Sequence, residues 1–530
     1  MLTSKLHRSE TNLFNHQQLD LVYNQDKFKS FINRPFELNN FGAQIKEKQN
    51  EFTKEQRVTL VNQLKNQYGE NFRSTQLNEN LELLLDENTF TITTGHQLSL
   101  FTGPLYFIVK ILHVIKMCKE LKDAQPKQNF VPVYWLASED HDFEEIQSMN
   151  IFNQQLKWNS AQEGPVGRFS LDEQFEEVKQ QFSAFFSSAE VDEINKVVKS
   201  YVGKDFTSAT RGLVHHFFNK FGLVIIDGDD VSLKESFSPI IEKELTEQFS
   251  FKAITETNTQ LEKAGVKLQV NAREINLFYI DKGIRTRIIK EGEYFRIDGV
   301  GTYTLSEILE LLNKSPECFS PNAIFRPLYQ ESILPNLCYV GGGGEISYWL
   351  QLKNIFETAG VIYPLVQVRN SVMWIDGGTS KKMDKQGLSI DDLFKSEDLL
   401  KKEFIETNES EALNFENLDS TSENLTNELN QMILNVEPGL QQYSNAEIAK
   451  LNKQIEGVKN KLIKTSKSKH SGAMKNIELI KSKLFPNNGL QERHANFFGF
   501  CADGKVTLRI DMLYVALDPF EKDLIVLREN

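Results

Sequence analysis

The sequence predicts an α/β protein with a mostly parallel sheet and a separate C-terminal pair of long helices. The first observation is a strand–loop–helix–strand unit at residues 91–137, in which two apolar, β-branched strands flank an amphipathic helix. The second is another apolar, β-branched strand at residues 223–226, of the kind that is buried on both faces. Acids and a glycine follow it. The third is a heptad-like apolar repeat beyond residue 389, typical of paired helices. Open α/β sheets bind ligands at the carboxyl ends of their strands.

The first half of the chain divides into an N-terminal helical segment and the start of the sheet. Residues 1–90 are polar and amphipathic, most clearly at 51–68, and we expect them to be a helical part of the core. Residues 91–94 form the first expected strand. Gly103-Pro104 then suits a helix start, because the N–H that proline lacks would be unpaired there anyway. Apolar residues at helical spacing predict a helix from 107 to about 121, and 131–137 is the next strand.

Two insertions are expected in the core, which we place at residues 91–388. The first, at about 150–220, contains helices near 171–185 and 210–221; the strand 223–226 and a helical region 231–265 follow it. The second, at about 265–320, alternates apolar and polar residues around glycine turns at 281–283 and 290–292, which predicts an antiparallel meander. Thr304 and Glu307 form a capping-box pattern for a helix to about 313. A strand at 338–340, a helix at 346–358 and a strand at 361–369 complete the core.

The C-terminal part of the chain is predicted to be a coiled-coil helical hairpin at residues 389–486. Helical stretches at 391–436 and 446–484 flank the turn signal Pro438-Gly439. The apolar seam of this hairpin is expected at Leu425, Leu429, Met432, Val436, Ile448, Leu451, Ile455, Val458 and Leu462. Its surplus apolar stripe predicts contact with a second copy, and therefore a homodimer. Residues 487–530 are expected to pack back on the core.

Composition argues against several classes of protein. A length of 530 residues favours more than one structural unit, and a net charge of −13 without a basic patch disfavours nucleic acid as a partner. The N-terminus lacks an apolar leader, and the most apolar helix is interrupted by lysines, so we expect a cytoplasmic protein without a membrane span. The 4 cysteines form no CxxC pair, which disfavours a zinc site; we expect no metal centre.

Two polar clusters follow the first two expected strands. Gly95, His96 and Gln97 come directly after the first, where a histidine before a helix can donate to a phosphate and a glycine permits close approach of a ligand. The alternative is a polar loop with a turn glycine. Residues 139–142, Glu-Asp-His-Asp, follow the second strand, and we expect a general base or amine-binding site at Glu139, Asp140 and His141. A metal ligand set or a solvated acidic loop are the alternatives.

Further candidates occur later in the core. Gly341, Gly342, Gly343 and Gly344 with Glu345 form a strand–glycine–helix junction that suggests phosphate binding without matching a complete phosphate-loop signature; a loose surface loop is the alternative. Arg326 with Gln330, and Arg369 with Asn370, place guanidiniums that suit carboxylates, or structural ion pairs, beside core elements. Lys382 and Lys385 could neutralise a triphosphate, although the same pattern is typical of a solvated helix start.

These residue blocks closely resemble the bacillithiol-biosynthesis cysteine-adding family, BshC. The resemblance rests on 94–97 (TGHQ) with 100–106 (LFTGPLY), on 131–145 (VPVYWLASEDHDFEE), on 326–330 (RPLYQ), on 339–353 and on 368–371 (VRNS), and it extends over nearly the whole chain. It implies a Rossmann-like nucleotidyltransferase-type core with inserted connecting segments and a C-terminal α-helical antiparallel coiled coil that makes a dimer. The core is similar to that of class I aminoacyl-tRNA synthetases. Thr93 stands where that superfamily carries the first histidine of its H-x-G-H motif, and Asp384 stands where its K-M-S-K-S motif has serine.

The reaction implied by the resemblance joins the carboxyl of cysteine to the amine of glucosaminyl malate. His96 would stabilise charge during activation of cysteine, and the 139–141 cluster would bind the cysteine ammonium or deprotonate the attacking amine. Arg326 or Arg369 would hold the malate carboxylates, and the glycine loop with Glu345, Lys382 and Lys385 would bind a nucleotide. ATP with Mg²⁺ is the candidate activating nucleotide, and no tightly bound cofactor is expected. The alternatives are another ATP-dependent amide-forming ligase or nucleotidyltransferase with a different amine acceptor, and a dimeric binding protein that has lost catalysis.

Overall fold

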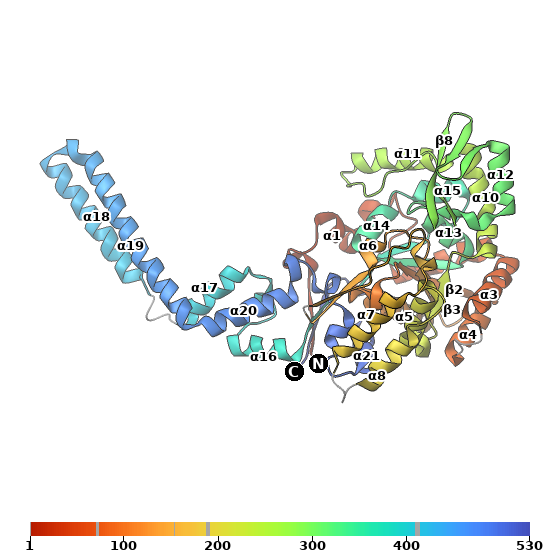
Figure 1. Ribbon diagram of the computed structural model, residues 1–530. Coiled ribbons are helices and arrows are strands. Elements are labelled where there is room, and N and C mark those ends of the chain that lie inside the picture. The colour runs from red at the N-terminus through yellow and green to blue at the C-terminus, as the bar shows by residue number, and fades with distance from the viewer. Residues whose placement is uncertain (1, 70–73, 153, 187–190, 409–413) are drawn as a thin grey trace. The chain divides into compact units, whose positions relative to one another are not determined.

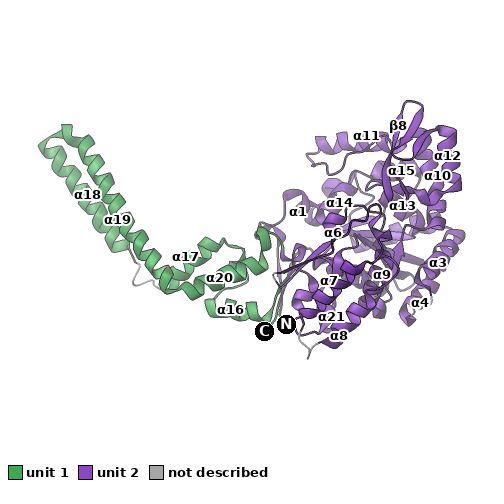
Figure 2. Ribbon diagram, viewed as in Figure 1, with its two compact units in different colours: residues 1–2, 374–490, 528–530 green, residues 3–373, 491–527 purple. Residues whose placement is uncertain are grey.

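The protein consists of two compact units, shown separately coloured in Figure 2. The computed structural model describes residues 2–69, 74–152, 154–186, 191–408 and 414–530. We call residues 3–373 with 491–527 the core unit, and residues 374–490 with the chain ends at 2 and 528–530 the helical unit. The division thus falls at residue 374, where the sequence suggested residue 389. A small three-stranded sheet, order β1-β15-β14, is formed by Leu2–Leu6, Leu524–Arg528 and Ser371–Ile375.

The core unit is built on a five-stranded parallel sheet with strand order β13-β12-β2-β3-β6. Its strands are β2 (Thr89–His96), β3 (Asn129–Leu136), β6 (Val224–Asp227), β12 (Asn336–Gly341) and β13 (Leu365–Val368). The chain proceeds outward from β2 in one direction through β3 and β6 and in the other through β12 and β13. The order therefore reverses at β2, the position where open α/β sheets form their ligand crevice.

Buried threonine hydroxyls of β2 find hydrogen-bond acceptors on the neighbouring strand β12. The hydroxyls of Thr91 and Thr93 donate to Oδ1 of Asn336 over 3.2 and 2.8 Å, and that of Thr94 donates to the Val340 carbonyl over 2.7 Å. β-Branched residues suit a strand, and their hydroxyls cost little here because each has a partner. The polar side chains of β2 thus fix its pairing with β12.

Helices cover the parallel sheet (Figure 1). The central helix α5 (Tyr106–Ala124) packs on β2 and β3, and α2 (Phe41–Glu51) packs on β12. Their apolar faces and the sheet form a common core that includes two buried cysteines, Cys118 and Cys338. The other helices around the sheet are α1 (His16–Tyr23), α3 (Lys54–Tyr68), α4 (Thr75–Leu83), α9 (Phe206–Phe218) and α21 (Val506–Ala516), the last of which packs on α5.

Two groups of elements lie between strands of the parallel sheet along the chain, one between β3 and β6 and one between β6 and β12. The first contains a hairpin that the sequence did not predict, β4 (Ser148–Ile151) with β5 (Gln154–Lys157), and the helices α7 (Glu173–Ala184) and α8 (Val191–Ser200). The second contains α10 (Val231–Glu247) and α11 (Phe249–Lys263) and, after them, an antiparallel sheet, order β10-β9-β8-β7-β11. Its strands are β7 (Leu277–Asp281), β8 (Ile284–Glu291), β9 (Tyr294–Ile297), β10 (Gly301–Thr304) and β11 (Phe319–Pro321). The predicted capping box starts α12 (Leu305–Lys314).

Three local predictions in the core were wrong in extent. Residues 1–90, expected to be helical, begin with strand β1. The helix expected at 346–358 is two helices, α14 (Gly343–Trp349) and α15 (Lys353–Ala359). The strand expected at 361–369 is only β13, which starts directly after Pro364, because proline has no N–H to donate to a sheet ladder.

The helical unit contains the predicted antiparallel hairpin (Figure 1). Its two long helices, α18 (Glu416–Val436) and α19 (Gln441–Lys469), are joined by a short turn at Pro438–Leu440. The unit also contains α16 (Gly377–Gln386), α17 (Glu397–Asn408) and α20 (Ser471–Leu484), of which α17 and α20 contact α19 and α16 packs on α20. The predicted helix 391–436 corresponds to two helices, α17 and α18. The predicted helix 446–484 also corresponds to two, α19 and α20, which meet at His470.

The apolar repeat of α18 faces outward from the hairpin, contrary to the predicted seam. Half-buried positions of α18 are Ser422, Thr426, Asn430 and Ile433, whereas Leu425 and Met432 are 44% and 64% exposed. Polar contacts replace the expected apolar ones, since the Ser422 hydroxyl donates to the amide oxygen of Asn452 over 3.3 Å. The exposed apolar stripe consists of Leu418, Leu425, Leu429, Met432 and Val436 on α18 with Val458 and Leu462 on α19. No described helix is both long and apolar enough to cross a membrane.

Candidate active site

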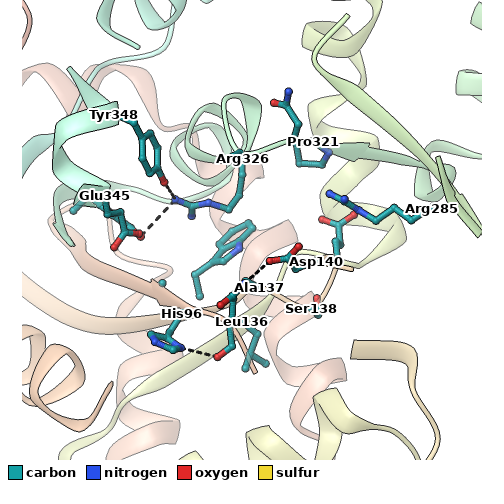
Figure 3. A pocket seen from close by; sticks show the side chains of 17 residues that line it. His96, Leu136, Ala137, Ser138, Asp140, Arg285, Pro321, Arg326, Glu345 and Tyr348 are labelled. Atoms are coloured by element: carbon teal, nitrogen blue, oxygen red, sulfur yellow. Dashed lines mark hydrogen bonds between the residues drawn. The ribbon is translucent and has the colours of Figure 1, made fainter. Parts of the chain in front are cut away.

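A cavity of about 230 Å³ lies at the carboxyl ends of the central strands of the core unit (Figure 3). It is lined by the ends of β2 and β3, by Arg285 of β8, by the segment after β11, and by helices α13 (Phe325–Ile333) and α14. Seven of the predicted site residues line it: Gly95, His96, Gln97, Glu139, Asp140, Arg326 and Glu345. Strand pairing explains their convergence, because His96 is opposite Leu136 and Thr93 is opposite Tyr339 in the parallel ladder.

His96 is held as a neutral imidazole. Its Nδ1 lies 2.7 Å from the Gln97 carbonyl, which can only accept, so Nδ1 carries the proton and Nε2 accepts from the Tyr106 hydroxyl at 3.1 Å. Burial, reinforced by the positive charge of Lys110, lowers the pKa of His96 to about 4. The sequence had suggested that His96 stabilises negative charge. Both nitrogens of the neutral ring already have hydrogen-bond partners. To stabilise negative charge on a substrate, His96 would have to exchange one of these hydrogen bonds for one to the substrate.

Glu345 is the centre of a buried charge cluster. The Lys110 ammonium donates to Glu345 over 2.8 Å and to the Gly95 carbonyl over 2.6 Å, and the Tyr339 hydroxyl donates to the second carboxylate oxygen. Burial, which raises the pKa of a carboxyl, is outweighed by Lys110 and Arg326, so the pKa of Glu345 lies below its ordinary value. Glu345 is therefore an ionised wall of the cavity.

Arg326 completes this cluster from α13. Its guanidinium donates to Gln330 over 2.9 Å and to the Tyr348 hydroxyl over 3.4 Å. Burial lowers the pKa of a guanidinium, but Tyr339, Tyr348 and Glu345 more than compensate, so the pKa of Arg326 is raised. Gly95 leaves room beside it, since a Cβ there would approach the Tyr339 hydroxyl to 3.0 Å, closer than an ordinary van der Waals contact.

Asp140 forms the opposite, acidic side of the cavity. The Gln97 amide donates to it over 2.7 Å and also to Glu145 over 2.9 Å, so Gln97 links the two strand ends. Burial raises the pKa of Asp140, but the bonds from Gln97 and from the His141 backbone outweigh it and hold that pKa below its ordinary value. Asp140 is thus a carboxylate at neutral pH.

His141 is hydrogen-bonded to Arg285, a residue of the inserted antiparallel sheet. Arg285 donates to Nδ1 of His141 over 2.8 Å and stacks on the Phe278 ring at 3.8 Å from its centroid. The Nε of Arg285 is buried and has no partner among the described residues. Burial lowers the pKa of Arg285. His141 itself does not line the cavity, whereas Arg285, which the sequence did not identify, does.

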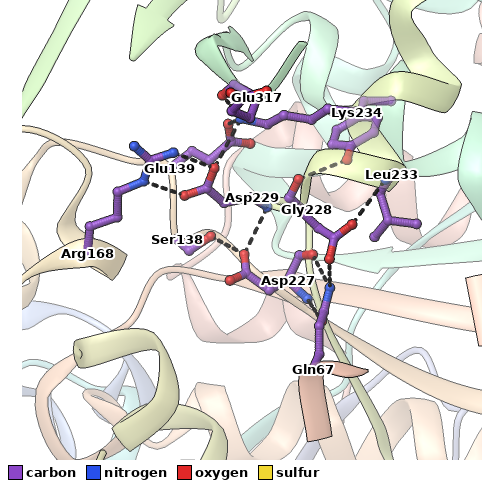
Figure 4. A network of polar contacts seen from close by, with 12 residues as sticks. Gln67, Ser138, Glu139, Arg168, Asp227, Gly228, Asp229, Leu233, Lys234 and Glu317 are labelled. Atoms are coloured by element: carbon purple, nitrogen blue, oxygen red, sulfur yellow. Dashed lines mark hydrogen bonds and ion pairs between the residues drawn. The ribbon is translucent and has the colours of Figure 1, made fainter. Parts of the chain in front are cut away.

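Glu139 is held by a polar network behind the cavity (Figure 4). The buried Lys234 ammonium lies 2.6 Å from Glu139 and 3.1 Å from Asp229, and Asp229 also pairs with Arg168 over 2.7 Å. Burial and the neighbouring Asp229 raise the pKa of Asp227 to about 6, and Asp227 accepts a hydrogen bond from Ser138. The network fixes the end of β3, from which Ser138, Glu139 and Asp140 project.

The remaining predicted residues lie outside this cavity. Gln330 is buried behind Arg326, which donates to it. Arg369 pairs with Glu492 over 2.9 Å, and Asn370 contacts His113.

The lining residues of the cavity also do not include the predicted glycine loop, Gly341, Gly342, Gly343 and Gly344. A Cβ at Gly341 would approach the Glu345 carboxylate, and one at Gly343 would approach Gln18. Lys382 and Lys385 lie on α16 of the helical unit, so their expected role in nucleotide binding stays a prediction.

Several lining residues escaped the sequence analysis. Arg285, Tyr348 and Ser138 line the cavity, and Lys110 supports it from α5. The signal for Lys110 was present, since it interrupts the most apolar face of a predicted helix. Arg285 gave no comparable signal, because its strand belongs to an insertion whose position depends on tertiary structure. Within the described residues, no group of three or more His, Cys, Asp and Glu side chains is arranged to hold a metal ion.

A parallel sheet with a reversal at β2, a charged crevice at that reversal and an appended helical hairpin define a Rossmann-like α/β protein with a coiled-coil domain. Comparison with known families identifies it further. Residues 1–370 match the model described as "Bacillithiol biosynthesis BshC, N-terminal Rossmann-like domain", and residues 372–529 match "Bacillithiol biosynthesis BshC, C-terminal coiled-coil domain". The chain belongs to the BshC family.

Curated relatives agree with this assignment. Proteins described as "Putative cysteine ligase BshC" from Flavobacterium johnsoniae and Christiangramia forsetii are 40% identical over 505 residues and 39% identical over 539 residues. The first alignment covers 95% of each chain and the second 99% of each. A relative of the same description from Bacillus mycoides is 26% identical and covers 78% of this chain and 80% of its own. The fold and the family are thereby established over the full length of the core and the coiled coil.

Proposed function

We propose that this protein is a ligase that joins the carboxyl of cysteine to the amine of glucosaminyl malate, the step that completes bacillithiol. The cysteine-ligase description of its relatives supports the reaction class. The observation that carries the proposal is the charge pattern of the cavity, which is lined by the carboxylates of Glu139, Asp140 and Glu345 and by the guanidiniums of Arg285 and Arg326. Both substrates carry an amine and at least one carboxylate, and this pattern complements them.

The acidic wall is the expected site for an amine. Asp140 is ionised and fixed by Gln97, and Glu139 is fixed by Lys234, so both carboxylates are oriented before a substrate arrives. An ionised carboxylate with a lowered pKa binds an ammonium well and is a weak base. We therefore assign Asp140 to holding and orienting the amine.

The two guanidiniums that line the cavity are the expected sites for carboxylates. Arg326 lies deep in the cavity, and Arg285 reaches it from the inserted sheet with one N–H donor unpaired. Guanidinium groups bind carboxylates through two parallel hydrogen bonds, which fixes the orientation of the bound group. Arg285 thus becomes the first candidate for a malate carboxylate, a role that the sequence had suggested for Arg326 or Arg369.

The cavity's size limits what it holds at one time. A volume of about 230 Å³ is below the roughly 300–1,000 Å³ of typical ligand pockets. We expect it to hold the reacting ends of the two small substrates. ATP as the activating nucleotide, with Mg²⁺, remains part of the proposal and is supported by the Rossmann-like fold alone.

The test is product formation from cysteine, glucosaminyl malate and ATP, followed by mass spectrometry. The wild-type protein is expected to form the amide, and Asp140→Asn is expected to lower kcat/KM by at least about 100-fold, because the neutral amide no longer attracts the ammonium. Glu144→Gln is the matched control, since Glu144 is a nearby exposed acid outside the cavity, and it should retain wild-type activity. Absence of product with the wild-type protein, or an unaffected Asp140→Asn variant, would refute the proposal.

A further inference from the structure

A second, smaller cleft in the core unit is lined by three arginines. Arg8, Arg369 and Arg493 share it with Glu492. Arg8 and Arg369 are only 2% and 5% exposed, whereas Arg493 lies at the surface. The cleft is separate from the candidate active site, and none of its lining residues is among those of the larger cavity.

The two buried guanidiniums have one acid between them. Among the described residues that line this cleft, Glu492 is the single acid, and its oxygens already accept from the Ser371 hydroxyl at 2.7 Å, the Val372 N–H at 2.8 Å and Arg369 at 2.9 Å. Arg8 donates from Nη2 to the Arg369 carbonyl over 3.2 Å. Burial lowers the pKa of Arg8 to about 10, so it is charged at neutral pH. Among the described residues, Arg8 thus makes no direct ion pair with an acid, although Glu492 and Asp523 attract it from a greater distance.

Each buried guanidinium also has an unused donor. The Nε atoms of Arg8 and Arg369 are buried and have no hydrogen-bond partner among the described residues. Leaving a buried N–H unpaired is unfavourable, and leaving a buried charge without a direct partner costs more. Two such donors in one cleft, beside a third arginine, are the arrangement expected of an anion-binding site.

We infer that Arg8, Arg369 and Arg493 form a binding site for a phosphate dianion, supplied either as free phosphate or as the phosphate of a nucleotide. Three guanidiniums against one carboxylate leave two positive charges, which match a phosphate group with a charge of about −1.5 to −2 at pH 7. Guanidinium forks bind phosphate oxygens through paired hydrogen bonds. The buried carboxylate of Glu492 pairs with Nη1 of Arg369 and so orients this guanidinium. The Nε of Arg369 stays available for the anion.

The cleft contacts the active-site wall through Tyr106. The guanidinium of Arg369 stacks over the Tyr106 ring at 4.8 Å from its centroid, and the Tyr106 hydroxyl lies 3.1 Å from Nε2 of His96. A bound phosphate would thus lie one aromatic ring behind His96. The inference does not rest on the proposed ligase activity, because binding is measured directly.

Entry of phosphate requires one side chain to move. The cleft has a volume of about 10 Å³, room for about one water molecule. Arg493 is the exposed member and has the freedom to swing outward and close over the anion. This also makes it the residue to vary, since an exposed side chain is removed without disturbing the core.

The experiment is a calorimetric titration of the full-length protein with inorganic phosphate. Wild-type protein should bind, Arg493→Ala should weaken the Kd by about tenfold or more, and Arg8→Lys, which keeps the charge but loses the fork, should weaken it similarly while circular dichroism stays unchanged. Arg273→Ala removes an exposed arginine elsewhere in the core unit, and Asp140→Asn alters the other cavity. Both should bind phosphate within twofold of wild type.

Competition distinguishes the sources of the phosphate. If ATP displaces phosphate and Arg493→Ala weakens both, the site takes a nucleotide phosphate; if ATP does not compete, it takes free phosphate, and either result supports the inference. Undetectable phosphate binding, or equal binding by wild type and Arg493→Ala, overturns it. Tighter binding of malate than of phosphate, lost in Arg493→Ala, also overturns it in favour of a carboxylate site. None of these results bears on whether Asp140→Asn reduces amide formation.

Discussion

At the scale of single residues, the cavity is prepared by side chains that do not touch it. Arg326 is oriented by Gln330, whose amide donates to Glu331 over 2.8 Å, and Glu331 also accepts from Asn336 over 2.7 Å. Asn336 in turn accepts from the Thr93 hydroxyl on β2. A buried chain of polar groups thus connects Arg326 to the central strand, and each group is costly to leave unpaired.

Glu331 makes this chain sensitive to pH. Burial, only partly offset by Lys48, raises the pKa of Glu331 to about 7. Because the folded pKa is above the unfolded one, the stability associated with its protonated form is full below about pH 4.5 and is lost as pH rises through 7. Glu331→Gln should therefore gain stability over wild type between pH 5 and pH 8, by up to about 3 kcal/mol at roughly 1.4 kcal/mol per pKa unit.

Thermal melting of both proteins at pH 5 and pH 8 measures this difference. Glu79→Gln, which changes an exposed acid on α4, should show the same pH dependence as wild type. An identical pH dependence of wild type and Glu331→Gln would show that Glu331 is not protonated in the folded protein.

Arg285 is predicted to determine affinity for the amine acceptor. Arg285→Ala should raise KM for glucosaminyl malate by about tenfold or more with a smaller change in kcat, because a charge-assisted hydrogen bond to a bound carboxylate contributes roughly 1.5–3 kcal/mol. Steady-state kinetics of the proposed reaction provide the measurement. Arg287→Ala, two residues along the same strand and outside the cavity, is the control. A lower kcat at unchanged KM would place Arg285 in the chemical step.

At the scale of elements, α5 and α14 are joined by the Lys110–Glu345 pair. The two side chains are 4% and 22% exposed, and the same lysine binds the Gly95 carbonyl at the end of β2. Helix α5 therefore sets both the end of the central strand and the ionised wall of the cavity. The sequence predicted the helix from its apolar spacing, and the single lysine within that face marked the connection.

Removing one member of this pair should be strongly destabilising. Lys110→Met leaves the Glu345 carboxylate without its main partner, and the loss of one partner of a buried ion pair costs about 3–5 kcal/mol. The double variant Lys110→Met with Glu345→Gln should recover a substantial part of that loss, since no uncompensated charge remains. Chemical denaturation of the three proteins measures the coupling. Additive effects of the two substitutions would show that the pair does not interact.

At the scale of the whole molecule, the outward apolar stripe of the helical unit favours a dimer. Its α18 members recur at heptad spacing, and polar residues occupy the contact inside the hairpin instead. Exposed leucines and a methionine in such a pattern are typical of a surface covered by another helix. We propose that the stripe pairs with a second copy of the chain.

Charged substitutions on the stripe should separate the two copies. Leu425→Glu together with Met432→Glu is expected to weaken the dimer at least about 100-fold, because burying each side chain contributes roughly 1.5–3 kcal/mol and a buried carboxylate opposes it. Analytical ultracentrifugation gives the oligomeric state, and circular dichroism checks that the hairpin remains helical. Lys450→Glu, at an exposed charged position of α19, should leave the dimer intact. A monomeric wild-type protein, or a dimeric double variant, would refute the assignment.

The sequence by itself determined the local elements, because apolar periodicity and glycine turns are set by neighbours along the chain. The β2–α5–β3 unit, the meander, the capping box at Thr304 and the helical hairpin were all predicted in this way. It also identified both strand ends at which His96 and Asp140 stand, since polar residues after a buried strand are visible without a structure.

Tertiary structure alone decided which of these residues meet. Arg285 reaches the cavity from an insertion, while Arg369 joins Arg8, from the N-terminal segment, in a different cleft. Three further properties also depend on groups that are far away in sequence. They are the tautomer of His96, the hydrogen bond between His141 and Arg285, and the exposure of Leu425. The physical reason is that hydrogen bonds, charge pairs and burial act over ångströms in space, and the pattern along a chain records only which residues are near in sequence.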